Sequence, residues 1–246
     1  MNAAPLPQEE TAVVGTVEAV ELAVREATWP FAVAHRAEID AAFAQARRHK
    51  PGLWNGEVLL FRDCRIADGV LRGEAFVTDY ASFLAWRRRP EADPAVRNLF
   101  ACAAVEGSDG GFLLGEMAPG TANAGEIYFP CGTPDRADVR DGYVDVAFSA
   151  HRELQEETGI DPARLALMPG WRVVRGGALI ALVRHMRAAE PAAVLRAAAL
   201  AHLRRERQPE LADVVVVGSR ARIDARIAPF AAAFLRDVWQ RCGEGG

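Results

Sequence analysis

Lysine is almost absent from this chain of 246 residues: Lys50 is the only one, and arginine supplies the rest of the basic side chains. The formal net charge is −4 and the pI is about 5.8, so the protein has no general attraction to nucleic-acid polymers. No apolar run is long enough to span a membrane, and no basic segment leads into an apolar one at the N-terminus. We therefore expect a cytoplasmic protein that has neither a membrane nor a nucleic-acid polymer as its partner.

Cysteine is also scarce, and its spacing excludes a further class of site. The four cysteines, Cys64, Cys102, Cys131 and Cys242, lie far apart with no close pair. This spacing argues against a zinc site and fits scattered reduced thiols. The sequence carries no sign of an oligomeric state.

The most informative stretch present is Arg-Glu-Leu-Gln-Glu-Glu-Thr-Gly-Ile at residues 152–160. If residues 146–158 form a helix, Glu153, Glu156 and Glu157 project from one face while Ala150 and Leu154 turn inward. Like charges at this spacing weaken a helix by a few tenths of a kcal/mol per pair, and a hard divalent cation would relieve the repulsion. The pattern favours Mg²⁺ or Mn²⁺ and a phosphate-containing substrate; the alternative is an acidic solvated helix ended by a glycine cap.

This string resembles the second half of the signature of the Nudix hydrolases and matches it at every specified position. In that family the string is preceded by a glycine, five residues, a glutamate and seven residues. Counting back, Val144 stands where the glutamate is expected and Asp138 where the glycine is expected. Residues 127–132 nevertheless resemble the family's strand and glycine loop, with Gly132 twenty residues before Arg152 instead of fourteen. We therefore infer an insertion of six residues ahead of the helix.

The inserted stretch is acidic, and one of its carboxylates could replace the missing glutamate, which in the family orients the arginine. We favour Asp145, because it lies next to the start of the helix. An ordinary helix N-cap is an equal alternative for this residue. The acids of this stretch are Asp135, Asp138, Asp141 and Asp145.

The resemblance also implies roles for the other residues of the site. Glu156 and Glu157 would bind metal, Glu153 would be the base or a third metal ligand, and Arg152 would hold a carboxylate in place. The Gly132 carbonyl could reach the ion. A further ligand could come from downstream, either Glu206 or Glu210, although either could equally be a surface charge at a helix end. The catalytic candidates are Arg152 and Glu153; the metal candidates are Glu153, Glu156 and Glu157; the substrate-side candidates are Gly132, Asp145, Glu206 and Glu210.

The fold implied is an α/β/α sandwich with a mixed sheet, preceded by an N-terminal α+β extension. We expect residues 1–11 to be poorly ordered, 12–95 to form an accessory unit that packs on the core, and 96–246 to form the Nudix domain. Arginine clusters at 87–89 and 204–205 offer forked donors to phosphate, or are solvated helix faces. The regular elements expected are strands at 13–27, 99–105, 111–117, 126–130, 165–168, 171–186 and 214–217, a hairpin at 57–77, and helices at 34–49, 80–86, 146–158, 191–207 and 227–241.

The activity implied by the resemblance is metal-dependent hydrolysis of the diphosphate linkage of a nucleoside diphosphate joined to another group. The long insertion favours slightly the branch that cleaves nucleotide sugars. The loop Phe129-Pro130-x-Gly132 resembles instead the branch that cleaves coenzyme A. A Nudix-fold module that binds a nucleotide or a protein without cleaving it belongs to a different class, and the altered first half of the signature is its support.

Overall fold

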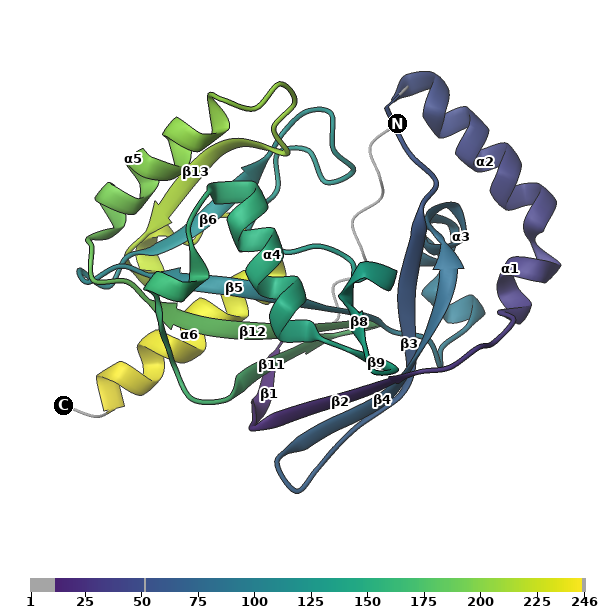
Figure 1. Cartoon of the computed structure of the whole chain (residues 1–246), viewed down its shortest axis with the longest axis horizontal. Helices are drawn as coiled ribbons and strands as arrows, with labels where there is room; N and C mark the ends of the chain where they lie inside the picture. The colour runs from purple at the N-terminus through teal and green to yellow at the C-terminus, as the bar shows by residue number, and fades with distance from the viewer. Residues whose placement is uncertain (1–11, 51, 245–246) are drawn as a thin grey trace.

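The computed structural model describes residues 12–50 and 52–244, and its elements form two sheets with flanking helices (Figure 1). Residues 1–11, expected to be poorly ordered, lie outside the described residues. The larger sheet, sheet A, has the order β1-β11-β12-β5-β6-β13, with β10 beside β12 and β7 beside β6. Its strands are β1 (Ala12–Val17), β5 (Asn98–Glu106), β6 (Phe112–Met117), β7 (Ile127–Tyr128), β10 (Ala166–Leu167), β11 (Trp171–Gly176), β12 (Leu179–Arg187) and β13 (Leu211–Val217).

The smaller sheet, sheet B, has the order β3-β4-β2-β9-β8. Its strands are β2 (Ala19–Val24), β3 (Glu57–Ala67), β4 (Val70–Asp79), β8 (Val139–Arg140) and β9 (Tyr143–Val144). The helices are α1 (Pro30–Ala34), α2 (Arg36–His49), α3 (Tyr80–Arg87), α4 (Val146–Thr158), α5 (Ala192–Leu203) and α6 (Pro229–Glu244), with short 3-10 turns η1 (Pro90–Ala92), η2 (Arg136–Asp138), η3 (Pro162–Arg164) and η4 (Arg220–Arg222).

Sheet A lies between two helical layers. Its central strands β5 and β12 are parallel, and its other neighbouring strands pair antiparallel. Helices α4 and α5 cover one face and α6 covers the other (Figure 1). Side chains of β5 alternate between these faces: Ala101 packs in one cluster with Ala150 of α4, whereas the Phe100 ring meets Phe230 of α6 at 5.3 Å. The expected α/β/α sandwich with a mixed sheet is confirmed.

The N-terminal unit has its own aromatic core. Phe83 and Trp86 of α3 are almost fully buried, and the Trp86 ring lies 6.2 Å from that of Trp29. Asp79 caps α3 by accepting from the Ser82 N–H at 3.0 Å. The aromatic residues at 80–86 are therefore largely core, as their spacing indicates. The turn of the β3–β4 hairpin falls at Asp68 and Gly69, both with positive φ, as expected from the Asp-Gly pair.

The extended run near the N-terminus is divided between the two sheets. The prediction of a single strand at 13–27 is therefore wrong. β1 pairs with β11 in sheet A, and β2 pairs in parallel with β4 in sheet B. In the other direction, β8 and β9 come from the acidic insertion and join sheet B, where Ala23 of β2 faces Tyr143 of β9. Each unit therefore contributes strands to the other's sheet across the boundary expected at residue 95. Among the described residues, no helix is long and apolar enough to cross a membrane.

Candidate active site

The acidic string lies in the second half of α4. The helix spans Val146–Thr158, which are the bounds predicted from the sequence. The Asp145 side chain caps the helix by accepting from the Phe148 N–H at 2.9 Å, and Gly159 ends it in the left-handed conformation with φ of +69°. Ala150 and Leu154 are buried against sheet A, as the helical spacing requires. This packing fixes the face from which the glutamates project.

The three glutamates of α4 stand in different environments. The side chain of Glu156 is 59 % exposed, that of Glu153 only 12 % exposed, and Glu157 is buried. Burial raises the pKa of Glu153 to about 7; the charges of Glu156 and Glu210 add to the rise and Arg152 opposes it. Burial also raises the pKa of Glu157 well above its usual range, and the charge of Glu153 adds to it.

Glu157 combines burial with an unsatisfied oxygen. Its carboxylate accepts a hydrogen bond from the Cys131 backbone N–H, while its Oε2 is buried with no hydrogen-bond partner. A buried carboxylate oxygen without a partner is costly, because it has lost water and gained nothing in return. The position thus favours a cation or a proton at Oε2.

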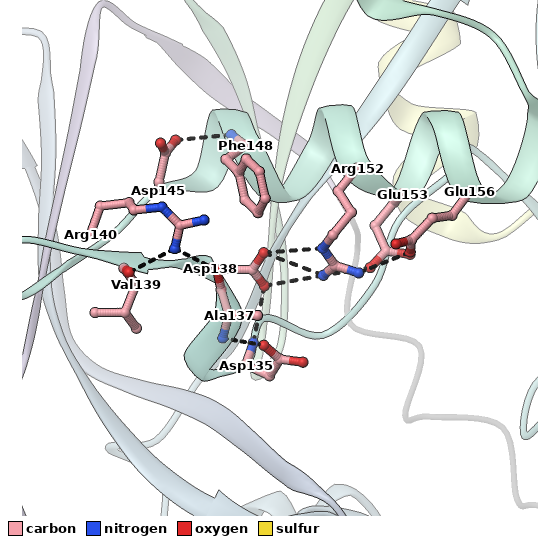
Figure 2. A network of polar contacts seen from close by, with 10 residues as sticks. All are labelled: Asp135, Ala137, Asp138, Val139, Arg140, Asp145, Phe148, Arg152, Glu153 and Glu156. Carbon is pink, nitrogen blue, oxygen red and sulfur yellow. Dashed lines mark hydrogen bonds and ion pairs between the residues drawn. The ribbon is translucent and has the colours of Figure 1, made fainter.

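Arg152 is held among three carboxylates (Figure 2). Its Nη2 lies 2.9 Å from Glu153 Oε1 and its Nη1 lies 3.0 Å from Glu156 Oε2. Its Nη2 is also 3.3 Å from both oxygens of Asp138, whose side chain is completely buried. The guanidinium therefore fixes Glu153 from one side and is itself fixed by Asp138.

Asp138, and not Asp145, is the acid that meets Arg152. It lies at the end of η2, where its Oδ2 also accepts from the Asp135 N–H at 3.1 Å. Asp145 points its carboxylate at the start of α4 and is the N-cap, which is the second of the two alternatives weighed from the sequence. The insertion thus supplies the carboxylate partner of Arg152, from a position that adjacency to the helix did not single out (Figure 2).

The remaining candidates divide by position. Gly132 lies directly against Glu153: a methyl group built on its Cα would come within 2.6 Å of the Glu153 Cδ. The charge of Glu210 contributes to the raised pKa of both Glu153 and Glu157. Glu206 pairs instead with Nε2 of His202 at 3.1 Å, an ordinary i,i+4 contact at the end of α5. Of the two downstream acids, Glu210 is therefore the better candidate.

The donor set suits a hard divalent cation. Glu157 offers an unpartnered oxygen, and Glu153 and Glu210 are further carboxylates close by. Within residues 12–50 and 52–244, no group of three or more His, Cys, Asp or Glu side chains is arranged to hold a metal ion. Mg²⁺ typically uses one or two protein carboxylates and takes its other ligands from water and substrate phosphates, so a partial protein site is compatible with it.

No protein-family model and no curated protein matches this chain. Solved structures similar to it include the Nudix hydrolase RenU from M. smegmatis, at 18% identity over 59% of this chain and 84% of that chain, with a TM-score of 0.39. Another is the MutT protein from Methanosarcina mazei Go1, at 15% identity over 59% of this chain and 96% of that chain, with a TM-score of 0.37. Likeness at this level assigns neither family nor activity.

Proposed function

We propose that this protein is a metal-dependent hydrolase of the Nudix type, which cleaves the diphosphate linkage of a nucleoside diphosphate joined to another group. One observation carries the proposal: Glu157 is buried beside Glu153 and keeps an oxygen without a partner. A solvated acidic helix would leave these side chains in water, where repulsion is screened. The buried oxygen of Glu157 that has no partner, next to the carboxylate of Glu153, instead calls for a cation.

The metal would be held by Glu157 and Glu153, with Glu156 and Glu210 as further ligands. A bound Mg²⁺ or Mn²⁺ would supply charge compensation for the diphosphate and would lower the pKa of a bound water. Where Glu153 does not itself bind the metal, it would be the base that takes a proton from the attacking water. Arg152 is a positioning residue, because it contacts the Glu153 carboxylate and is itself anchored by Asp138.

For the substrate, we propose a nucleotide sugar. Supporting it, the insertion forms β8 and β9 and is tied to β3 by the bond from the Leu59 N–H to the Pro134 carbonyl at 2.7 Å. The N-terminal unit is thereby joined to the loop that follows Gly132, where the second half of a bipartite substrate could lie. A coenzyme A-type substrate is the alternative within the same chemistry.

A non-catalytic nucleotide- or protein-binding module is the second candidate function. It is favoured by the ion pairs of Arg152, which neutralise Glu153 and Glu156 without a metal. Such a module would have no need for the buried, unpartnered oxygen of Glu157. We therefore place hydrolysis first.

Metal binding separates the two candidates. Calorimetric titration with Mg²⁺ or Mn²⁺ should show binding by the wild type and by Glu91→Gln, an exposed control, and loss of binding by Glu157→Gln. Mutation of a residue that hydrogen-bonds to a metal ligand commonly costs 10- to 100-fold in metal affinity or activity. Loss of the ligand itself, here Glu157, should therefore cost at least about a hundredfold. No metal binding by the wild type would favour the non-catalytic module.

Turnover then identifies the substrate. Phosphate release after a coupled phosphatase should be measured with UDP-sugars, coenzyme A, ADP-ribose, NADH and dinucleoside polyphosphates. We expect metal-dependent cleavage of one class by the wild type and by Glu91→Gln, and none by Glu157→Gln. Cleavage that Glu157→Gln leaves unchanged would refute the assignment of the site.

A further inference from the structure

The last turn of α4 carries two of the candidate metal ligands. The helix ends at Thr158, so Glu156 and Glu157 both belong to that turn. The last four carbonyls of an α-helix have no N–H partner within the helix, and helix ends fray. How well the two glutamates are held therefore depends on which donors meet the carbonyls at the end of α4.

One of these donors comes from within the segment and another from a different helix. The Gln155 carbonyl accepts from the Gly159 N–H at 2.9 Å. The next carbonyl, that of Glu156, lies 2.9 Å from Nε2 of His202, a residue of α5 that is 46 positions further along the chain. Helices α4 and α5 lie on the same face of sheet A and contact each other (Figure 1). The end of α4 is thus completed by a side chain of its neighbour.

The surroundings of the His202 ring show which of its nitrogens carries a hydrogen. Besides the Glu156 carbonyl, Nε2 lies 3.1 Å from Oε1 of Glu206. A carbonyl oxygen and a carboxylate oxygen both accept, so the hydrogen is assigned to Nε2, which donates it. His202 is therefore a donor directed at the end of α4.

Gly159 allows the His202 ring to come this close. A Cβ built on Gly159 would lie 2.7 Å from Nδ1 of His202, closer than packed atoms can approach. The φ of +69° already favours glycine here, and the close ring is a second reason for it. Ala199 and Leu203 of α5 are buried in the core, so a packed helix and not a loose loop sets the place of the ring.

We propose that His202 is a positioning residue of the candidate metal site. By donating to the Glu156 carbonyl it holds the last turn of α4, and thereby places Glu156 and Glu157 where they would bind the ion. This inference rests on the proposed function, because that function supplies the metal. The competing explanation is that the ring only fills space between α4 and α5.

The test compares three variants by two measurements. His202→Phe keeps a ring and loses the donor, His202→Gln keeps an N–H donor, and His49→Phe makes the same change at an exposed histidine at the end of α2. The measurements are calorimetric titration with Mg²⁺ and hydrogen–deuterium exchange of the amides at 155–160. The bond goes to the backbone of a ligand, so we expect His202→Phe to weaken Mg²⁺ binding about tenfold, the lower end for residues that support a metal ligand.

His202→Phe should also speed exchange at 155–160, because exchange reports local opening of the helix end. His202→Gln should restore both quantities to within about threefold of the wild type, and His49→Phe should change neither. Thermal melts show which variants are folded. His202→Met, which also lacks the donor, takes the place of His202→Phe if the latter does not fold.

Wild-type Mg²⁺ affinity in His202→Phe would overturn the proposal even if its Tm falls, because the ring would then serve packing alone. Equal weakening by His202→Phe and His202→Gln would overturn it as well, because the donated hydrogen would not be the cause. In both cases Mg²⁺ binding by the wild type leaves the proposed function standing. Absence of Mg²⁺ binding by the wild type would reject that function. Exchange would then decide on His202 alone: faster exchange in His202→Phe but not in His202→Gln supports its hold on the last turn, and unchanged exchange refutes it.

Discussion

Replacing Asp138 by asparagine tests whether the insertion anchors the candidate site. The side chain of Asp138 is completely buried, and its carboxylate contacts Arg152 at 3.3 Å. Removing one partner of a buried ion pair costs about 3–5 kcal/mol when the other charge is left uncompensated. Arg152 retains Glu153 and Glu156 and is 24 % exposed, so we expect a smaller cost of about 2–3 kcal/mol. In a chain of this length that corresponds to a fall in Tm of about 4–12 °C.

The matched control is Asp141→Asn. Asp141 belongs to the same insertion but is exposed, and its positive φ of 49° suits asparagine as well as aspartate. Thermal unfolding should show a clear fall in Tm for Asp138→Asn and no significant change for Asp141→Asn. Activity of Asp138→Asn should fall further than its stability accounts for, because Arg152 would no longer be fixed beside Glu153. A Tm for Asp138→Asn within about 1 °C of the control would refute the reasoning.

Two further predictions follow from close packing and from burial. Gly132→Ala should displace the Glu153 carboxylate and lower Mg²⁺ affinity about tenfold by calorimetry, whereas Gly218→Ala, whose added methyl meets nothing within 4 Å, should not; equal affinities would contradict the contact. Burial lowers the pKa of His185 below its usual 6.5, against the opposing effect of Glu106. The folded state thus favours the neutral ring, and the resulting stability is present above pH about 6.5 and is lost as the pH falls below it. Urea unfolding at pH 7.5 and 5.5 should show this loss in the wild type and less of it in His185→Gln; parallel behaviour would exclude His185 as its source.

The sequence predicts those features of the candidate site that depend only on residues close together in the chain. Helix α4 begins after Asp145 and ends at Gly159, because its cap, its glycine and its apolar spacing all lie within one short segment. The inward direction of Ala150 and Leu154 follows from the same spacing. The opposite exposures of Glu156 and Glu157 do not follow from it, since they depend on what each side chain meets in the core and the glycine loop.

The features that were not predictable depend on contacts distant in sequence. Asp138 ends η2 directly before β8, and β8 and β9 are strands of sheet B, so the contact with Arg152 depends on pairing between distant segments. Proximity along the chain pointed to Asp145 instead. The run at 13–27 alternates as one strand would, and only its pairing with β11 and β4 shows that it changes sheets. Likewise, the three consecutive arginines at 87–89 differ only through the fold: Arg87 donates to Asn123, Arg89 lies near Glu38, and Arg88 is exposed.

The strand run that changes sheets has a consequence for the order of folding. β1 is the first described strand to leave the ribosome, yet its partner is β11, and Arg172 contacts Thr16 across 156 residues of chain. At synthesis rates of about 5–20 residues per second, β1 waits roughly 8–30 s for that partner. β2 waits nearly as long for β9, which comes from the insertion. The N-terminal unit is thus synthesised first but completed late, and its unpaired strand edges are exposed to aggregation throughout that interval.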